Sequence, residues 1–315
     1  MEESRYSRQT ILFGNELQKK IEGSTIGLVG LGALGSNSAE ALARMGVGNL
    51  ILIDRDIVEE HNLHRTALYE ESDVGLPKDY AARKKIADIN SSINVKSYSL
   101  DIMNSDLSML SNCDIILDCL DNMNARRRLN EYCLKNGKDW IYSSAIKNYG
   151  EAKIFINKEE CYECLYADKE TDERCTTHGV NPAIIRAVSS LQVNLLIKYL
   201  KGDYDRSLQR LNLEGETLIK LNVEKKKDCV CTTHAFSELD AEQKCGNNLW
   251  QFSFDKERYK DIVERNRKEK NISVITDEFV KVGEATIFCN GRILINSEEN
   301  DAKILFEKIT GFYVK

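Results

Sequence analysis

A glycine-rich loop between a buried strand and a helix constrains the fold of this chain more than any other feature. Residues 25–29 (TIGLV) form a short apolar run without polar alternation, as expected of a strand that is buried on both faces. The run leads into GLGALG at residues 30–35, and residues 36–45 then have helical spacing. A strand, a glycine loop and a helix in this order predict a nucleotide-binding α/β fold.

Strands and helices alternate along the rest of the chain. Further strands are predicted at residues 49–54, 95–100, 113–118, 140–143, 152–156, 208–213, 217–223, 285–289 and 292–295. Further helices are predicted at residues 78–90, 124–135, 183–200, 256–270 and 300–309. The alternation predicts a Rossmann-like, mostly parallel sheet with helices on both faces. Ligands of such sheets bind at the carboxyl ends of the strands.

The glycines of the loop have separate expected roles. Gly30 allows the tight turn, Gly32 allows a phosphate or ribose to approach the backbone, and Gly35 allows the helix to pack closely on the sheet. Asp54 ends the next strand and is placed to accept hydrogen bonds from ribose hydroxyls. This pattern alone does not separate NAD from ATP.

Charged and polar residues gather after the predicted strands, in loops or in first helical turns. They fall at residues 54–56, 62–65, 75–78 and 118–122, the last group followed by Arg126. Arg65 and Lys78 are suited to the oxygens of a triphosphate. Asp121 is suited to hold Mg²⁺, which keeps its waters and needs few carboxylates. The set favours ATP over NAD, because a dehydrogenase has no use for such a phosphate site.

Five stretches together resemble the ThiF/MoeB/HesA family, relatives of the ubiquitin-activating enzymes. They are RYSRQ at 5–9, GLGALG at 30–35, DRDIVEEHNLHR at 54–65, GLPK at 75–78 and DCLDN at 118–122. The resemblance covers about residues 4–231. It implies ATP-dependent adenylation of the C-terminal glycine of a ubiquitin-like sulfur-carrier protein that ends in Gly-Gly, with release of pyrophosphate. We therefore predict an adenylating domain at residues 1–231 and a small α/β extension at residues 232–315.

The resemblance also implies roles for individual residues. Asp54 would bind the ribose, Asn62, Arg65 and Lys78 the phosphates, and Asp121 the Mg²⁺ ion. The full nucleotide-binding set is Gly30, Gly32, Ala33, Gly35, Asp54, Asp56, Asn62, Arg65, Lys78, Asp121 and Asn122. The expected catalytic residues are Arg8, Arg65, Lys78, Asp121 and Cys175. Arg8 would reach into the site of a partner subunit, so a homodimer is expected.

Four cysteines predict a structural zinc site. Cys161 and Cys164 have the two-residue gap that lets both thiolates reach one tetrahedral Zn²⁺. Cys229 and Cys231 follow at the expected distance, but with one residue between them where the family has two. His234 or Cys245 therefore remains a candidate substitute ligand. A redox Cys-x-x-Cys is the weaker alternative, because the thioredoxin-like context is absent.

Cys175 lies in a polar loop just before the long helix predicted at residues 183–200. The family that this chain resembles carries a cysteine here. In its sulfur-transfer members the cysteine bonds covalently to the activated carrier or relays sulfur, and in other members it is dispensable. A position near a helix N-terminus would lower the pKa of the thiol and favour the thiolate. A sulfurtransferase or a cysteine desulfurase is then a further expected partner.

Composition excludes several other classes. The net charge of −6 argues against nucleic acid as the main ligand. No stretch approaches the roughly 18 uninterrupted apolar residues of a membrane span, and no secretory signal is recognised at the N-terminus. Ten cysteines without such a signal indicate a reducing compartment, so a cytoplasmic location without membrane contact is expected.

Other functions stay open at this point. The chain can activate a carrier for protein conjugation, or be a relative of the tRNA-modifying dehydratases, although those usually lack the zinc cysteines. An NAD-dependent oxidoreductase and an inactive binding scaffold are weaker alternatives, because the charged set is complete. Residues 232–315 lack the rhodanese-type cysteine loop that some relatives append, and we expect them to serve docking or dimer packing.

Overall fold

The computed structural model describes residues 5–103, 105–166, 179–234, 249–268 and 271–311. The chain divides into two compact units. Unit 1 comprises Met1–Arg55, His61–Glu70 and Lys78–Ala241, and unit 2 comprises Asp56–Glu60, Glu71–Pro77 and Glu242–Lys315. Two short segments that precede residue 78 therefore belong to the same unit as the C-terminal part of the chain.

Unit 1 contains an eight-stranded sheet in the order β3-β2-β1-β4-β5-β6-β7-β8. Its strands are β1 (Thr25–Val29), β2 (Asn49–Asp54), β3 (Asn94–Ser99), β4 (Ile115–Asp118), β5 (Trp140–Ile146), β6 (Tyr149–Phe155), β7 (Leu208–Asn212) and β8 (Thr217–Leu221). The strands from β3 to β5 pair in parallel, whereas β6, β7 and β8 are added antiparallel. The predicted α/β class is confirmed, and the sheet is mixed.

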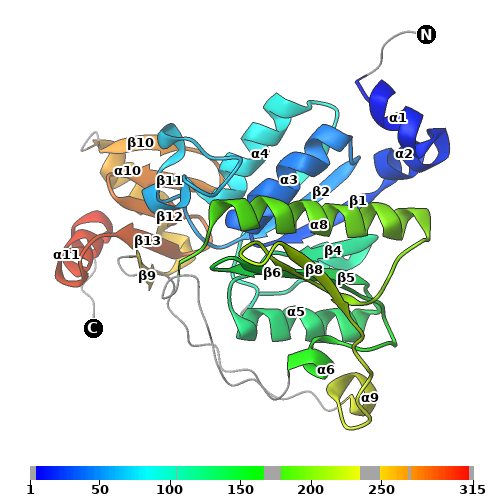
Figure 1. Ribbon diagram of the computed structural model, residues 1–315. Helices are drawn as coiled ribbons and strands as arrows, with labels where there is room; N and C mark the ends of the chain where they lie inside the picture. Colours follow the sequence, from blue (N-terminus) through cyan, green and yellow to red (C-terminus); the bar gives the residue numbers. More distant parts are fainter. Residues whose placement is uncertain (1–4, 104, 167–178, 235–248, 269–270, 312–315) are drawn as a thin grey trace. The chain divides into compact units, whose positions relative to one another are not determined.

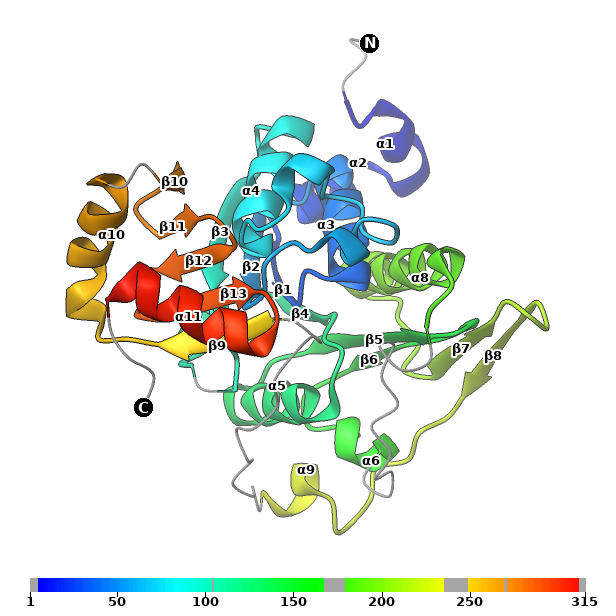
Figure 2. The same ribbon diagram turned by 90° about the vertical axis from the view of Figure 1, so that its left-hand side faces the viewer.

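Helices cover both faces of this sheet. They are α1 (Ser7–Phe13), α2 (Asn15–Gly23), α3 (Ala33–Met45), α4 (Lys78–Ile89), α5 (Met123–Asn136), α6 (Tyr162–Tyr166), α8 (Pro182–Lys201) and α9 (Val230–Thr233). Figures 1 and 2 show α3, α4 and α8 on one face and α5 on the other. Strands β1 and β4 are almost wholly buried between these layers, which explains their uninterrupted apolar sequences.

Helix α8 is long and apolar enough to cross a membrane by length and composition alone. It packs instead against α3, β5 and β6 in unit 1. Its buried side includes two polar residues, Ser189 and Gln192, which bond to Leu34 O and to backbone carbonyls of the sheet. These contacts are those of a core helix in a globular domain.

Unit 2 contains a five-stranded antiparallel sheet in the order β10-β11-β12-β13-β9. Its elements are β9 (Leu249–Ser253), α10 (Tyr259–Lys268), β10 (Ile272–Ile275), β11 (Phe279–Val282), β12 (Ala285–Phe288), β13 (Arg292–Asn296) and α11 (Glu299–Thr310). Apolar residues of both helices join the strands in one core that includes Ile262, Ile287 and Phe306. Thr286 Oγ1 donates to Gly75 O at 2.8 Å, which ties the segment before α4 to this sheet.

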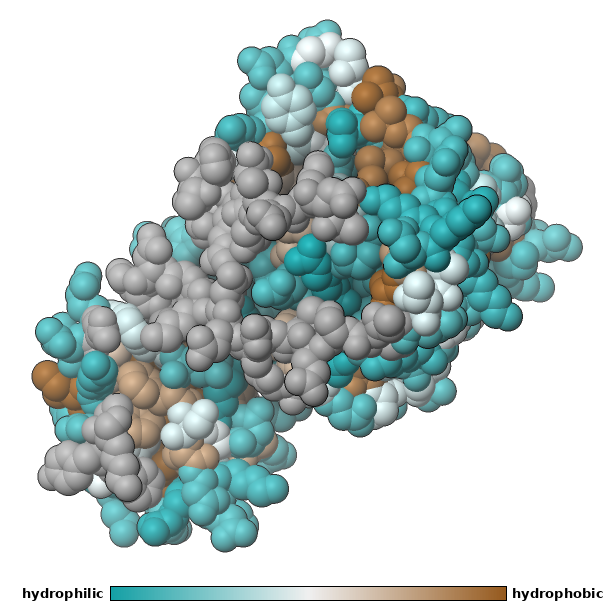
Figure 3. Space-filling view, turned by 90° about the horizontal axis from the view of Figure 1, so that it is seen from below, coloured by the Kyte–Doolittle hydropathy of each residue, from teal (hydrophilic) through white to brown (hydrophobic). Residues whose placement is uncertain are grey.

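The surface agrees with a composition in which 30% of the residues are charged. On the face drawn in Figure 3, hydrophilic side chains predominate and hydrophobic ones form small, separate patches. Scattered apolar residues of this kind are normal on a globular protein.

Candidate functional site

The glycine loop lies against the end of β4, and two of its positions admit no side chain. Gly30 has φ +89°, and a Cβ atom there would lie 2.6 Å from the carbonyl oxygen of Cys119. A Cβ atom on Gly35 would lie 1.9 Å from the carbonyl oxygen of Gly30. At Gly32 a Cβ atom would meet nothing within 4 Å, so the backbone is open to a ligand just before α3 begins at Ala33.

Asp54 reaches back to this loop from the end of β2. Its Oδ2 accepts a hydrogen bond from the Leu31 N–H at 2.5 Å, and the side chain is buried. The carboxylate therefore lies beside the glycine loop at the carboxyl edge of the sheet. That Asp54 binds the ribose of the nucleotide stays a prediction, and the position of its carboxylate is compatible with it.

The segment with Asn62 and Arg65 is tied to the first turn of α3. Asn37 donates from Nδ2 to Ala33 O at 2.7 Å and to Arg65 O at 3.0 Å. Asn62 is buried, and the Arg65 guanidinium donates to His61 O. Sequence reasoning missed Asn37, since a polar residue within a helical run gives no sign of the segment that it contacts.

Lys78 begins α4 and is buried, with 7% of its surface exposed. Tyr69 joins this helix start to the glycine loop, because its hydroxyl lies 2.7 Å from Leu31 O and 3.3 Å from Lys78 O. Tyr69 was not predicted from the sequence either. A buried tyrosine hydroxyl usually finds a hydrogen-bond partner, and this one bonds both the glycine loop and the start of α4.

The loop between β4 and α5 carries the expected magnesium ligand. Asp121 is exposed, and Asn122 caps α5 by accepting from Ala125 N at 2.8 Å. Burial raises the pKa of Asp118 to about 6, although Arg126 at 3.3 Å opposes the rise. An exposed carboxylate at a strand end fits a Mg²⁺ ion that retains most of its waters.

The predicted nucleotide residues of unit 1 thus gather at one edge of the sheet. The glycine loop, Asp54 and Asp121 follow the carboxyl ends of β1, β2 and β4, which are neighbours in the sheet. Asp56 belongs to unit 2. The edge offers backbone N–H groups, cations and a carboxylate, which are the groups that bind a nucleoside triphosphate with its metal.

Arg8 lies apart from these residues, on α1. Gln9 donates to Met45 O at 2.9 Å, and Asn90 donates to the Tyr6 hydroxyl at 2.7 Å. These contacts hold α1 at the C-terminal ends of α3 and α4. The glycine loop lies at the other end of α3, and the 13 residues of that helix span about 20 Å.

The four predicted zinc cysteines come together and are buried. The Sγ atoms of Cys161, Cys164, Cys229 and Cys231 all lie within 4.8 Å of one another. Cys161 and Cys229 are 3.5 Å apart at sulfur, as are Cys164 and Cys231. Tetrahedral zinc thiolate sites place sulfurs about 3.8 Å apart, so the set fits Zn²⁺.

The shorter gap of the second pair is accommodated by a helix start. Cys229 is the N-cap of α9 and Cys231 lies within its first turn, so both thiols face the first pair. The Lys226 N–H donates to Cys164 Sγ at 3.4 Å, a contact that stabilises a thiolate. His234 is not a member of this cluster. Cys175 and Cys245 lie outside the residues that the structure describes.

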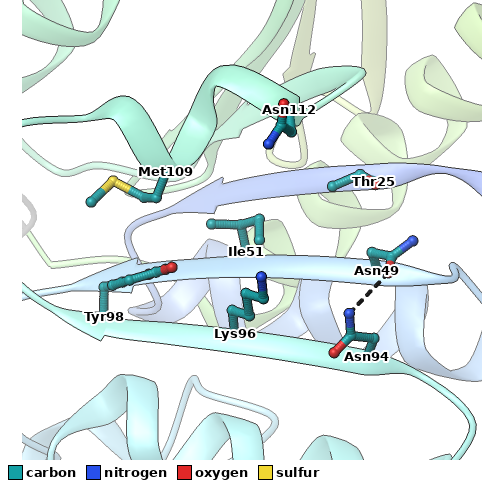
Figure 4. A pocket seen from close by; sticks show the side chains of 8 residues that line it. All are labelled: Thr25, Asn49, Ile51, Asn94, Lys96, Tyr98, Met109 and Asn112. Atoms are coloured by element: carbon teal, nitrogen blue, oxygen red, sulfur yellow. Dashed lines mark hydrogen bonds between the residues drawn. The ribbon is translucent and has the colours of Figure 1, made fainter.

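A cavity of about 340 Å³ opens elsewhere in unit 1 (Figure 4). It is lined by Thr25, Asn49, Ile51, Asn94, Lys96, Tyr98, Met109 and Asn112. Three of these residues begin β1, β2 and β3, whereas the predicted nucleotide residues follow the other ends of the strands. Lys96 is its single charged lining residue, and none of the predicted nucleotide residues lines it.

Comparison with known sequences finds a family match over the part of the chain that contains the glycine loop and the four cysteines. The profile of the ThiF family matches residues 6–233. The chain is 32% identical over 280 residues to an adenylyltransferase and sulfurtransferase MOCS3 of Drosophila persimilis, covering 84% of this chain and 61% of the relative. It is 34% identical over 265 residues to the MOCS3 of Culex quinquefasciatus, covering 77% and 58%. The chain therefore spans about three fifths of the length of these relatives.

Solved structures with the same fold are more distant in sequence. The crystal structure of E. coli MccB with succinimide has a TM-score of 0.64 at 22% identity and covers 74% of each chain. The structure of PaaA has a TM-score of 0.58 at 19% identity and covers 70% of this chain and 73% of that chain. These likenesses concern the fold.

We predict that the purified protein holds about one Zn²⁺ per chain and that Cys231→Ser loses it. Metal binding contributes folding free energy, so the melting temperature should fall by roughly 2–4 °C for each kcal/mol lost. Elemental analysis and thermal unfolding measure both effects. Cys289→Ser, which removes an exposed thiol outside the cluster, is the matched control and should retain the metal. Full zinc content in Cys231→Ser would contradict the four-cysteine site.

Proposed function

Because the chain belongs to the ThiF family, we propose that it is an adenylyltransferase that acts on the C-terminal glycine of a ubiquitin-like sulfur-carrier protein. The observation that carries the proposal is the meeting of the glycine loop, Asp54 and Asp121 at neighbouring strand ends of unit 1. The names of the MOCS3 relatives support the same activity. The carrier is expected to end in Gly-Gly.

The proposed reaction needs no nucleophile from the enzyme. A carboxylate oxygen of the carrier attacks the α-phosphorus of ATP, the bond to the bridging oxygen of the β-phosphate breaks, and pyrophosphate leaves. Catalysis then depends on positioning and on neutralising the phosphate charge. Arg65 and Lys78 would supply positive charge at the phosphates. Mg²⁺ held by Asp121 would neutralise further charge when bound.

The test of the proposal is pyrophosphate exchange into ATP, measured with each small Gly-Gly-ending protein of the source organism. We predict that Lys78→Ala and Asp121→Ala each lower the exchange rate about 100- to 1000-fold, as loss of one electrostatic contact does elsewhere. Lys84→Ala, which removes an exposed lysine from the same helix, is the control and should keep the rate. Near-normal exchange by either site variant, with the fold and zinc content intact, would refute the assigned ATP site.

We further propose that the enzyme is a homodimer in which Arg8 enters the site of the partner subunit. The contacts of α1 hold Arg8 about the length of α3 away from the glycine loop of its own chain. Ile11 and Leu12, on the same helix, are 77% and 80% exposed. Two adjacent exposed apolar side chains favour burial in an interface.

Mixed dimers distinguish action within a subunit from action between subunits. Arg8→Ala and Lys78→Ala should each be inactive alone. Mixed and reassembled in equal amounts, they should recover about a quarter of the wild-type exchange rate, because half the dimers then hold one intact site. Mixtures that stay inactive despite proven subunit exchange would exclude action of Arg8 in the partner's site.

Cys175 remains a proposed acceptor of the activated carrier or relay of sulfur. We predict that Cys175→Ala exchanges pyrophosphate at close to the normal rate, because adenylation needs no thiol. It should lose a covalent enzyme–carrier species that a thiol reductant cleaves, seen by electrophoresis, while Cys289→Ser should keep it. Normal formation of thiocarboxylated carrier by Cys175→Ala would show that a separate sulfurtransferase or cysteine desulfurase delivers the sulfur directly.

A further inference from the structure

Arg126 lies beneath the loop that carries Asp121 and is itself buried. Its side chain extends from the first turns of α5, with 8% of its surface exposed. The guanidinium Nε lies 3.3 Å from Asp118 Oδ2, and its terminal nitrogen donates to Leu120 O and, at 3.1 Å, to Ser143 O. One cation therefore contacts the end of β4, the loop that follows and the neighbouring strand β5.

These contacts hold the β4–α5 loop, residues 118–122, from several sides. Asp118 Oδ1 accepts from Leu120 N at 2.9 Å, so the carboxylate that pairs with Arg126 also bonds the loop backbone. The backbone N–H of Arg126 donates to the backbone carbonyl of Asn122 at 3.3 Å, as in the first turn of a helix. The Asn122 side chain in turn caps α5 and donates to Asp121 Oδ1 at 3.3 Å.

The guanidinium is also held on its far side. It lies 5.1 Å from the centre of the Tyr142 ring, within the range of a cation–π contact. The Tyr142 hydroxyl lies 3.1 Å from the hydroxyl of Tyr166, which also contacts Glu151. Glu151 pairs with Arg210 on β7 at 2.6 Å. The position of Arg126 is thus set by a buried network of hydrogen bonds and ring contacts.

We propose that Arg126 is a positioning residue that holds the 118–122 loop in the conformation required to bind ATP with Mg²⁺. This inference rests on the proposed function, since it concerns the same nucleotide site. Arg126 would act through Asp121 and Asn122, because the guanidinium is buried beneath them. One terminal nitrogen of its guanidinium donates to two carbonyl oxygens while Nε lies beside the Asp118 carboxylate, and a lysine ammonium on a flexible chain does not reproduce this arrangement.

A purely structural role makes a different prediction. If Arg126 only neutralises the buried Asp118, removing both charges together should restore the protein completely, because a buried ion pair can often be replaced by neutral groups without loss of stability. If Arg126 positions the loop, the same double variant should fold but bind the nucleotide less well, because its bonds to Leu120 O and Ser143 O are gone.

The experiment compares the wild type, Arg126→Lys and the double variant Asp118→Asn/Arg126→Met. Binding of ATP is measured by calorimetry over a series of Mg²⁺ concentrations, without any carrier protein, and the melting temperature is recorded for each variant. We expect both variants to need about tenfold more Mg²⁺ for half-maximal ATP binding, the size of effect seen when residues behind metal ligands are changed. The double variant should melt within a few degrees of the wild type.

Arg127→Met is the matched control. Arg127 is the next residue of α5, but it pairs with Glu163 at 2.9 Å and not with the loop. Its Mg²⁺ requirement should equal that of the wild type.

An unchanged Mg²⁺ requirement in the folded double variant would overturn the inference. If the double variant does not fold, an unchanged Mg²⁺ requirement in Arg126→Lys would overturn it. Failure of the wild type to bind ATP would count against the proposed function instead.

Discussion

The close approach of the glycine loop to β4 is the constraint on which the rest of the site depends. A side chain at Gly30 would overlap the carbonyl oxygen of Cys119, and one at Gly35 would overlap the carbonyl oxygen of Gly30. Because both positions are glycine, no side chain separates the loop from the sheet, and α3 begins directly beside the end of β4. The same approach brings the two loops that follow β1 and β4 together, and these loops carry the groups suited to a nucleotide and its metal.

A buried glutamine on α8 supports this arrangement from the helix side. Gln192 donates to Asp118 O at 3.0 Å and to Ile141 O at 3.1 Å, and it accepts from Ser38 Oγ at 2.7 Å. One side chain therefore joins α3, α8, β4 and β5. Arg126, on α5 at the other face of the sheet, contacts the side chain of Asp118 and the carbonyl of Ser143. Helices on both faces therefore contact the end of β4. Buried side chains that hydrogen-bond several backbone groups favour one conformation of the backbone around them.

The cysteine cluster joins two short helices in another part of unit 1. Helices α6 and α9 have five and four residues, too few to be stable alone, and they are separated by more than 60 residues of chain. Four buried thiols join them at one point. Tyr162, between two of these cysteines, packs against Tyr142 and Trp140. The cluster is thus adjacent to the aromatic side chains of the core, among them Tyr142, which also contacts Arg126.

The sequence by itself determined the parts that depend on local pattern. Apolar strands, the spacing of the glycines and the order of polar residues after each strand were sufficient to predict the α/β class and the edge where Asp54 and Asp121 lie, because parallel strands end at the same side of a sheet. Only the tertiary structure decided that β6 and β7 join the sheet antiparallel, that five strands form one sheet in unit 2, and that residues 56–60 and 71–77 belong to that unit. It also decided that Tyr69 and Asn37 support the site and that Arg126, one of several cations in the sequence, is buried against Asp118. These features arise from contacts between distant segments, and whether a side chain is buried depends on what packs over it, which no local periodicity records.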